Sequence, residues 1–463
     1  MGKRLVIVGL FYNITLTYFA EHRKHSILAH ISRILPIEKF TDICQKVYFA
    51  VDSYSELEFI LANGYLSYTF FAYFLATQLG VYKEYSNLCW NNLVNAFARL
   101  PLMLPASIHA IAVLALGTFN AIENSKMSLA WSFISYASNL CITLGYHRAP
   151  TDKGNSQAQQ TEQESLFWVV YNMDKGLSLR LGRSSNLRDR DITLKADPNE
   201  LRRTRLARIQ GKLYDQLYNQ EALSKPEQER ENIARALARE LREVIDETYI
   251  EVMDAERNSA LTDPMGAVYL RCELICSSSS LALVLRAIPT TSGPVGSVSD
   301  ECVAVAREVM DIHQQCMVTI RGSRGNASMF QKYINCILFT QAVQLRDRDD
   351  LARIERFSAS LKPDSYILAS PTHPHRIYEL LSRTARLFIE SSAESLPTDS
   401  ASTLPLTVSI NDFEFPHLGM ETESMANDIL NAEDLQAYSL SDWYYNNQQI
   451  MDLMHQDGMP WEF

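Results

Sequence analysis

The end of this 463-residue chain lacks positive charge. All 43 Lys and Arg residues lie at or before Arg386, whereas residues 387–463 hold 14 of the 54 Asp and Glu residues. The part up to Arg386 therefore carries a formal charge near +3 and the remainder −14, which together give the overall −11. Because the acidic charge belongs to the tail, the charge of the whole chain says little about its partners.

The eight cysteines lack the spacing of a metal site or a redox motif. No C-x-x-C pair occurs, and no set of Cys and His has the separations that zinc sites use. Most of them stand within apolar helical patterns, where a free thiol packs like a small hydrophobic group. We therefore expect free thiols in a reducing compartment. The cysteines are Cys44, Cys89, Cys141, Cys272, Cys276, Cys302, Cys316 and Cys336.

Motifs of common catalytic sites are also missing. The chain contains no G-x-S-x-G, no P-loop, no G-x-G-x-x-G after a strand and no H-E-x-x-H. A D-x-D-D run at 347–350 stands beside Arg346 and Arg353, and helix capping with surface ion pairs explains it better than an acid pair. His373 and His375 lack a third ligand at helical spacing. We predict no enzyme, no catalytic residue and no metal site.

The hydrophobic run at the N-terminus is not long enough to span a bilayer. The apolar stretch that follows Lys3 and Arg4 contains Asn13 and two threonines, is too short for a spanning helix and lacks a small-x-small cleavage site. Val6 breaks the myristoylation pattern that Gly2 would begin. We expect neither secretion nor a membrane partner.

Helical periodicity dominates what is present, and strand patterns are scarce. Residues 36–100 are helical and rich in aromatic side chains, Ser107 can cap an apolar helix over 108–122, and a helix over 125–144 should end at Gly145. We predict an all-α fold, a large irregular multi-helix domain without repeats. Further helices are expected at about 201–225, 227–258, 270–287, 300–321, 328–347, 349–361 and 376–391.

One stretch, residues 162–198, carries the most specific pattern. Apolar residues at helical spacing surround a single acid, Asp174, and the helix should end where Gly182 adopts the left-handed conformation. An acid inside an apolar stripe is costly unless it is hydrogen-bonded. We therefore expect Asp174 to pair with Arg183 or to accept a backbone donor at the helix end. The residues of the stripe are Phe167, Val170, Tyr171, Leu177 and Leu181.

A basic cluster follows this stretch. Arg202, Arg203, Arg205 and Arg208 could contact phosphates, but such a row on an amphipathic helix is more typical of a solvated face. We interpret it as a solvent-facing surface.

Three segments share a further set of positions, namely Leu144, Gly145, His147 and Arg148; Phe167, Trp168, Tyr171, Asp174, Lys175, Ser178, Leu181, Gly182 and Arg183; and Asp189, Asp191 and Ile192. Together these segments resemble the middle homology region of fungal-specific transcription factors, of the zinc binuclear cluster regulator family. They match an L-G-x-H-R helix end, an F-W-x-x-Y-x-x-D-[RK]-x-x-S-x-x-L-G-R helix and an extended D-x-D-I segment. The resemblance is sharp over about 108–218.

The resemblance implies a structural role for these positions, and we interpret them as fold determinants. Two departures from the family pattern occur, since Glu164 and Ser165 replace a basic pair and Ser184 replaces a proline. The structural signature residues are Gly145, His147, Phe167, Trp168, Tyr171, Asp174, Ser178, Leu181, Gly182, Arg183 and Asp191.

The sequence does not contain the six-cysteine motif of the family's zinc cluster. Family members carry zinc in that N-terminal cluster, so we expect no cofactor within the residues given. Direct DNA binding is expected only if such a cluster precedes Met1 in the complete protein.

Four domains follow from the pattern. Residues 1–35 form an atypical N-terminal segment, 36–390 the helical regulatory domain, 391–407 a Ser/Thr/Pro-rich linker and 408–463 a disordered tail. In this tail, acids interleave with Phe, Trp and Tyr residues, a composition typical of activation segments. Docking of the tail on the helical domain is the alternative.

By resemblance we expect a nuclear regulator of transcription by RNA polymerase II in a fungus, acting on a metabolic or secondary-metabolite gene set. Its partners would be the transcription machinery or coactivators, through the tail, and a second copy or related transcription factors. The alternative is an interaction partner or inhibitor of related factors that does not bind DNA itself.

Overall fold

The computed structural model describes most of the chain up to residue 362 and single positions beyond it. The helix expected over 328–347, the linker at 391–407 and the acidic tail at 408–463 lie outside the described residues, apart from position 347. The described residues are 28, 31–49, 53–101, 103–124, 126–149, 156–195, 201–259, 264–288, 298–322, 347–362, His375, Tyr378, Glu379, Ser382, Arg383, Ala385, Arg386 and Ile389.

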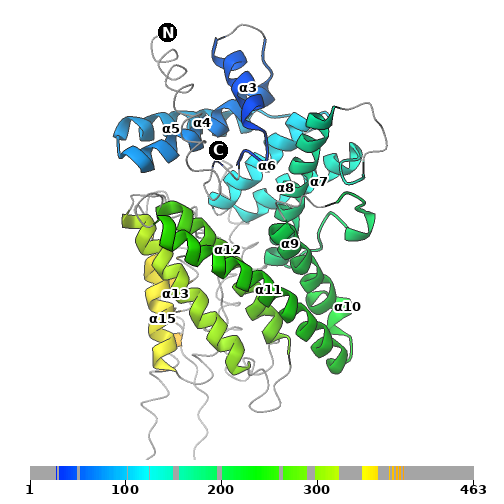
Figure 1. The fold of residues 1–463 in the computed structure, drawn as a ribbon, viewed down its shortest axis with the longest axis vertical. Helices are drawn as coiled ribbons and strands as arrows, with labels where there is room; N and C mark the ends of the chain where they lie inside the picture. Colours follow the sequence, from blue (N-terminus) through cyan, green and yellow to red (C-terminus); the bar gives the residue numbers. More distant parts are fainter. Residues whose placement is uncertain are drawn as a thin grey trace, which may run out of the picture.

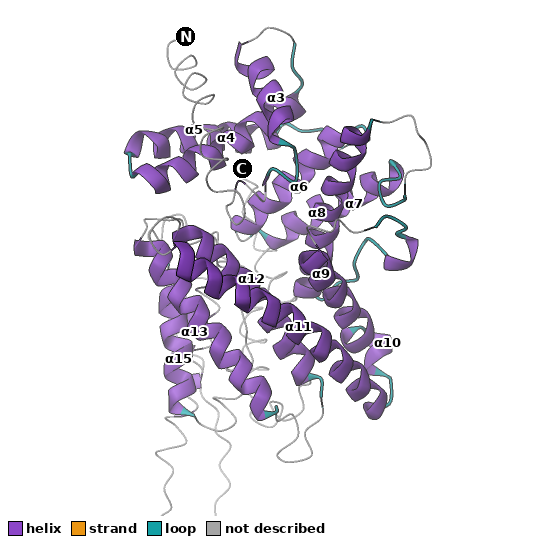
Figure 2. Ribbon diagram, viewed as in Figure 1, coloured by secondary structure: helices purple, strands orange, loops and turns teal. Residues whose placement is uncertain are grey.

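Within these ranges the fold is all-α, which confirms the predicted class, and Figure 2 shows helices and loops but no strand there. Helices α3 to α8 form the upper half of the molecule and α9 to α15 the lower half (Figure 1). The upper helices are α3 (Ile37–Phe49), α4 (Glu56–Thr77), α5 (Gly80–Phe97), α6 (Ile108–Glu123), α7 (Met127–Thr143) and α8 (Gln157–Leu181). The lower ones are α9 (Leu201–Leu213), α10 (Gln220–Leu223), α11 (Glu227–Ser259), α12 (Pro264–Arg286), α13 (Asp300–Gly322) and α15 (Arg348–Ser360).

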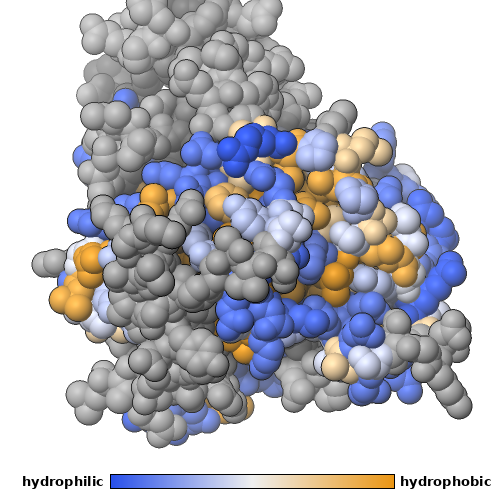
Figure 3. Space-filling model, turned by 90° about the horizontal axis from the view of Figure 1, so that it is seen from above, coloured by the Kyte–Doolittle hydropathy of each residue, from blue (hydrophilic) through white to orange (hydrophobic). Residues whose placement is uncertain are grey.

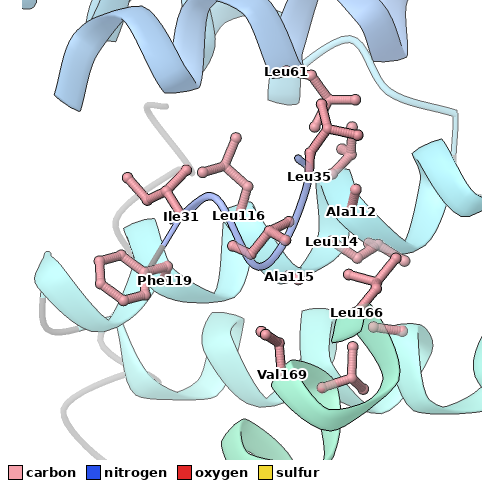
Figure 4. Packing of buried hydrophobic residues seen from close by; sticks show 14 of the residues in the cluster. Ile31, Leu35, Leu61, Ala112, Leu114, Ala115, Leu116, Phe119, Leu166 and Val169 are labelled. Atoms are coloured by element: carbon pink, nitrogen blue, oxygen red, sulfur yellow. The ribbon is translucent and has the colours of Figure 1, made fainter. Parts of the chain in front are cut away.

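A large apolar core joins the helices of the upper half. Leu61 of α4, Leu116 of α6 and Leu166 of α8 are buried in one cluster (Figure 4). Helices α4 and α6 cross closely, because a Cβ at Gly64 would overlap Leu116 Cδ2. Residues before position 36 belong to this core as well. Buried Leu35 lies in it, and its carbonyl accepts a hydrogen bond from Tyr65 Oη at 2.8 Å.

A second apolar core holds the lower half together. It is made by one face each of α9, α11, α12, α13 and α15, with α11, α12 and α13 packed in chain order as neighbours (Figure 1). Leu241 of α11, Val284 of α12 and Ala306 of α13 are almost fully buried there. The amphipathic spacing of these helices thus buries one stripe of each and leaves the charged face exposed.

The predicted helix ends are confirmed. Ser107 caps α6 by accepting the Ala110 N–H at 3.2 Å. Gly145 and Gly182, which follow α7 and α8, have φ angles of 74° and 62°, a left-handed conformation that glycine adopts at little cost. Position 182 thus turns the chain sharply away from the axis of α8.

The helix expected over 201–225 is interrupted. After α9 the backbone makes a π-helical turn, η3 (Tyr214–Tyr218), closed by a hydrogen bond from Asn219 N to Tyr214 O at 2.9 Å. The Asn219 side chain then caps the short α10 by accepting the Ala222 N–H. An asparagine inside a helical pattern therefore started a new helix, as its preference for N-caps would suggest.

Two helices are long and apolar enough to cross a membrane by length and composition, namely α4 and the segment Gly266–Arg286 of α12. In each, the larger share of the apolar window is buried inside the molecule, 72% for α4 and 61% for Gly266–Arg286. Core helices of soluble proteins pass the same test. On the upper face, apolar patches alternate with hydrophilic ones (Figure 3).

Candidate functional site

Asp174 lies fully buried on α8, and its carboxylate is saturated by donors from the loop that follows the helix. Its Oδ1 accepts the backbone N–H of Asn186 at 3.1 Å and the side-chain amide of Asn186 at 2.7 Å. Its Oδ2 accepts the backbone N–H of Leu187 at 3.0 Å. The expectation of a backbone donor for Asp174 is confirmed, although the donors come from the loop and not from the last turn of the helix.

The expected Asp174–Arg183 pair is wrong. Arg183 lies over the ring of Trp131 on α7, with its guanidinium carbon 5.5 Å from the ring centre. Gly182 reverses the chain, so that the Arg183 backbone N–H bonds back to Ser178 O at 2.9 Å and its side chain leaves toward α7. The Asp174 carboxylate instead accepts hydrogen bonds from Asn186 and Leu187, which follow Gly182 by four and five residues.

Lys175, next to Asp174, is only 2% exposed and is also fully bonded. Its Nζ donates to Leu187 O at 2.7 Å and to Ser185 Oγ at 2.9 Å, and lies 3.1 Å from Asp189 Oδ1. A buried ammonium group is tolerated only when its donors find such partners. We call Asp174, Lys175 and the loop residues 185–189 the α8 clasp.

The close packing of α9 keeps Lys175 in place. A Cβ at Gly211 would lie 2.9 Å from Lys175 Cδ and 3.2 Å from its Nζ. Since real Cβ atoms do not approach other atoms this closely, only glycine at position 211 leaves room for the stem of Lys175. The α8–α9 contact thus depends on the absence of a side chain.

Burial and charge shift the proton affinities of the clasp. Burial raises the pKa of Asp174, and the hydrogen bonds from Leu187 and Asn186, with the charge of Lys175, oppose that shift only in part. Burial also raises the pKa of Tyr171, which donates to Asp189 Oδ1 at 2.8 Å. The Asp174 carboxylate and the Lys175 ammonium are thus occupied by internal partners, which is suited to holding a loop.

His147 ties two of the sequence segments together. Its carbonyl oxygen accepts the N–H of Thr193 at 3.1 Å and of Leu194 at 3.3 Å. Its imidazole is buried, and Nε2 accepts from Arg148 Nε at 3.1 Å. Burial and the adjacent Arg148 guanidinium lower the pKa of His147. The end of α7 and the segment after the clasp are therefore joined through the backbone of His147.

The remaining signature residues are mostly buried around the clasp. Phe167, Trp168, Tyr171 and Leu181 pack in the upper core, and Ser178 Oγ donates to Asp174 O at 2.6 Å. Asp191 differs, because its side chain is 61% exposed in the 3₁₀ turn η1 (Asp189–Asp191). The structure thus brings the signature positions to one region, with Asp191 at its surface.

Sequence reasoning missed Ser185, Asn186, Leu187 and Gly211, which complete the clasp. The polar run after the helix-ending Gly182 was the available signal for the first two, since Ser and Asn favour turns. Nothing in the local pattern of α9 distinguishes Gly211, because its role comes from a residue 36 positions earlier in the chain.

The arginine cluster of α9 faces other helices. Arg202 pairs with Glu251 at 2.7 Å and with Glu273 at 2.8 Å, and Arg205 pairs with Glu247 at 2.6 Å. Arg203 also pairs with Glu273. The predicted solvent-facing surface is therefore wrong for these three arginines, because the carboxylates of α11 and α12 take up their charge.

The acidic run at 347–350 acts as predicted only in part. Asp347 caps α15, since its side chain accepts the N–H groups of Asp349 at 2.9 Å and Asp350 at 3.0 Å. Asp350, by contrast, is 1% exposed and both of its oxygens bind Arg307 of α13 at 2.7 Å. The expected surface ion pair instead joins two helices, with its carboxylate buried and the Arg307 side chain 38% exposed.

The other candidate residues of the sequence are not grouped into a metal site in the part of the chain that the structure describes. Among the described residues no three His, Cys, Asp or Glu side chains are grouped as metal ligands. His375 is buried with its Nδ1 3.8 Å from Glu379, and His373 lies outside the described residues. A solvent-open hollow of about 550 Å³ lies between α11, α12 and α13, away from the signature residues, and is lined by Arg235, Arg239, Arg242, Leu285 and Glu301, among others.

Comparison with known proteins places the clasp inside a recognised region. Residues 82–201 match the model of the fungal specific transcription factor domain. Over 68 residues the chain is 32% identical to an uncharacterized transcriptional regulatory protein of Schizosaccharomyces pombe. That alignment covers 15% of this chain and 8% of the length of the relative. No solved structure matches the chain.

Proposed function

From the fungal specific transcription factor domain that residues 82–201 match, we propose that the chain is a regulator of transcription by RNA polymerase II in a fungal nucleus. The similarity to a transcriptional regulatory protein supports this proposal. The observation that carries it is the α8 clasp, since Asp174, Lys175 and Gly182, which the resemblance identifies, build one internally bonded structure. A residue set that fixes a loop fits a regulatory domain better than an enzyme.

In this proposal three parts of the chain have different roles. Residues from about 36 to 390 are the regulatory domain, 391–407 the linker, and 408–463 the activation segment that contacts coactivators or the transcription machinery. The tail has the composition for this role, because its acidic residues keep Trp443, Tyr444 and Tyr445 solvated and available to a partner.

The tail can be tested apart from the rest. Residues 392–463, fused to a foreign DNA-binding domain in a fungal reporter strain, should switch on the reporter. Replacement of Trp443, Tyr444 and Tyr445 by Ala should remove most of that activity, while replacement of Asn446, Asn447 and Gln448 by Ala should leave it. A silent fusion that is expressed at normal levels would contradict the proposal.

DNA contact and targets belong to the same proposal. The regulator would reach DNA through a zinc cluster of the family type encoded ahead of Met1, and its targets would be a metabolic or secondary-metabolite gene set. Translating the genomic sequence upstream of Met1 tests the first point directly, because a C-x-x-C-x-x-x-x-x-x-C pattern should stand there in frame.

A second candidate is an interaction partner of related factors. It is favoured by one observation, namely that none of the eight cysteines of this chain stands in a C-x-x-C pair. Such a chain would pair with full-length relatives and alter their output without touching DNA. If no zinc cluster is encoded upstream and the purified chain co-purifies with a related factor, this candidate replaces the first.

A further inference from the structure

A solvent-open hollow in the lower half combines an apolar floor with a positively charged rim. It lies between α11, α12 and α13, which pack as neighbours (Figure 1), and has a volume of about 550 Å³. Pockets of this volume bury drug-sized ligands. Ala238 and Leu285, both almost fully buried, and the half-buried Ile288 make up the floor. The hollow therefore has room for an apolar side chain over an apolar floor.

The rim carries three guanidinium groups from one side of α11. Arg235, Arg239 and Arg242 follow one another at steps of four and three residues, the spacing that puts side chains on one side of a helix. Arg235 pairs with Glu231 at 2.6 Å, and Arg242 pairs with Glu301 at the start of α13. Arg239 is exposed, and no carboxylate pairs with it in the part of the chain that the structure describes. These two carboxylates thus leave one positive charge of the rim uncompensated.

The tail of the same chain has the opposite charge. Residues 387–463 carry 14 Asp and Glu residues and no Lys or Arg. In this tail Phe413 is the one aromatic residue with an acid on each side, namely Asp412 and Glu414. By contrast, the connecting residues 289–297, which follow the floor residue at 288, contain no acid. The tail therefore offers an aromatic ring and two carboxylates within three residues, which matches an apolar floor with an arginine rim.

The tail begins close enough to reach the hollow. Ile389, the last described residue, is buried in one cluster with Leu351 of α15. Asp350, next to Leu351, binds Arg307 of α13 at 2.7 Å. Arg307 follows Glu301 by six residues, roughly 9 Å along the helix. Only 22 residues separate Ile389 from the acid–aromatic segment, and such a chain spans up to roughly 75 Å when extended.

We propose that residues 411–416, with the sequence N-D-F-E-F-P, dock in this hollow of the same chain. In an extended segment successive side chains point to opposite sides, so Asp412 and Glu414 share one side and Phe413 takes the other. The ring covers the apolar floor, and the two carboxylates pair with the arginines of α11, above all with Arg239.

The contact is reversible and separate from the proposed role in transcription. Its ion pairs form at an exposed rim, where salt screens them. The docking segment contains none of Trp443, Tyr444 and Tyr445, on which the reporter test of the activation segment depends. Either proposal can therefore fail while the other holds.

The test uses the full chain with the photo-reactive residue benzoylphenylalanine in place of Asn232, an exposed residue of the hollow. Dilute protein is irradiated, the single-chain band is digested with pepsin, and cross-linked peptides are identified by tandem mass spectrometry. We expect a cross-link from position 232 to residues 411–416, with a yield at least about fivefold lower in about 0.5 M NaCl. The same group at Glu84, an exposed residue of α5 in the upper half, is the control and should not capture this segment.

Matched charge reversals on α11 locate the contact on the hollow. Arg239→Glu should lower the yield of the cross-link about fivefold, because a favourable charge becomes a repulsive one. Arg257→Glu makes the same change further along α11, at a side chain that is 76% exposed, and should leave the yield unchanged. The salt dependence of the otherwise unaltered helix decides the matter even if Arg239→Glu fails to fold.

Charge reversals in the tail locate the contact on the segment. Asp412→Lys combined with Glu414→Lys should lower the yield as Arg239→Glu does. Glu421→Lys combined with Glu423→Lys is the matched control, since these two acids have the same spacing but no aromatic residue between them. That variant should keep the cross-link. Adding Arg239→Glu to the Asp412 and Glu414 reversals should recover part of the lost yield.

Three results would overturn the proposal. The first is the absence of a cross-link from position 232 to residues 411–416. The second is a yield that the two pairs of tail variants lower equally, since the acids would then act only through overall charge. The third is a cross-link that forms only between two chains, because the segment would then dock on a second copy.

Discussion

Two buried carboxylates, one in each half of the molecule, are stabilised in different ways. Asp174 of the upper half has 0% exposure and binds neutral donors of a loop, the N–H groups of Asn186 and Leu187. Asp350 of the lower half has 1% exposure and binds the guanidinium of Arg307 through both oxygens. The first acid therefore fixes a loop against its own helix, and the second fixes one helix against another.

The difference also shows in what surrounds each acid. Of the residues that donate to Asp174, Leu187 is buried and Asn186 is half-buried, so water replaces their hydrogen bonds less readily. Arg307 has a side chain that is 38% exposed, and Asp347 lies 3.2 Å from its Nη2 as a second partner. Loss of Asp174 should therefore cost more than loss of Asp350, although both carboxylates are equally hidden.

The largest effect is expected for Asp174→Ala. Two backbone N–H groups would be left unpaired beside the buried ammonium of Lys175, and the Asn186 amide would keep only Ser135 Oγ as a partner. We expect a cost of about 3 kcal/mol in the free energy of unfolding. Urea unfolding followed by circular dichroism measures this loss. Asp191→Ala, at an exposed signature position, is the control and should change stability by less than about 0.5 kcal/mol. Equal losses for both variants would remove the distinction.

Asp350→Ala should follow, with a loss of about 2 kcal/mol, since a hydrogen-bonded charge pair is broken but Arg307 can turn to water. Its neighbour Asp349 offers the control, because its side chain is exposed. Asp349→Ala should therefore cost well under about 1 kcal/mol. A loss for Asp350→Ala that exceeds the loss for Asp174→Ala would reverse the comparison drawn above.

Gly211→Ala tests the clasp from the side of α9. The new methyl group would press on Lys175 at 2.9 Å, and we expect a loss of about 1–2 kcal/mol from overpacking. Gly80→Ala is the matched change, because a Cβ there meets nothing within 4 Å. That variant should be neutral or slightly stabilising, since alanine is the better helix former. A neutral result at position 211 would show that Lys175 is free to move.

The smallest effect is a pH dependence of opposite sign at Asp174 and Glu58. The pKa of Asp174 is raised above its ordinary 3.8 by burial. The folded state thus holds the proton of Asp174 more tightly than the unfolded state does. The contribution of this carboxyl to the free energy of unfolding is therefore complete below about pH 3.8, and it declines as the pH rises through the pKa of the folded state. The stability gap between wild type and Asp174→Asn should therefore narrow as pH rises.

For Glu58 the opposite is expected, because the difference in the free energy of unfolding between wild type and Glu58→Gln should widen as pH rises. Burial would raise the pKa of Glu58, but its bonds with Lys46 and Ser55 outweigh burial and lower the pKa from the ordinary 4.5. The stability from Glu58 is thus present above 4.5 and is lost as pH falls through the folded value. Urea titrations of wild type, Asp174→Asn and Glu58→Gln between pH 3 and 6 measure both slopes. If the stability differences of Asp174→Asn and Glu58→Gln from wild type changed with pH in the same direction, the opposite pKa shifts of Asp174 and Glu58 would be contradicted.

Much of the fold could be predicted from local patterns. The helix class, the caps at Ser107, Gly145 and Gly182 and the burial of Phe167 follow from spacing and from the conformational preferences of single residues. These features depend on neighbours within about one turn of helix, so the local sequence is sufficient to predict them. The interrupted helix at Tyr214–Tyr218 was not predictable, because a π-helical turn has no spacing of its own.

The candidate site was predictable in one respect. A lone acid in an apolar stripe must be buried and bonded, so the sequence by itself determined that Asp174 needs a partner. Which partner it takes was decided only by the tertiary structure, since the reversal at Gly182 carries Arg183 to Trp131 and brings Asn186 and Leu187 to the carboxylate. The same holds for the arginines of α9, whose carboxylate partners lie 42 or more residues further along the chain, and for Gly211, whose importance comes from the stem of Lys175. The local sequence shows that a buried charged group needs a hydrogen-bond or ion-pair partner. Which residue becomes that partner depends on how helices distant in the chain pack against one another.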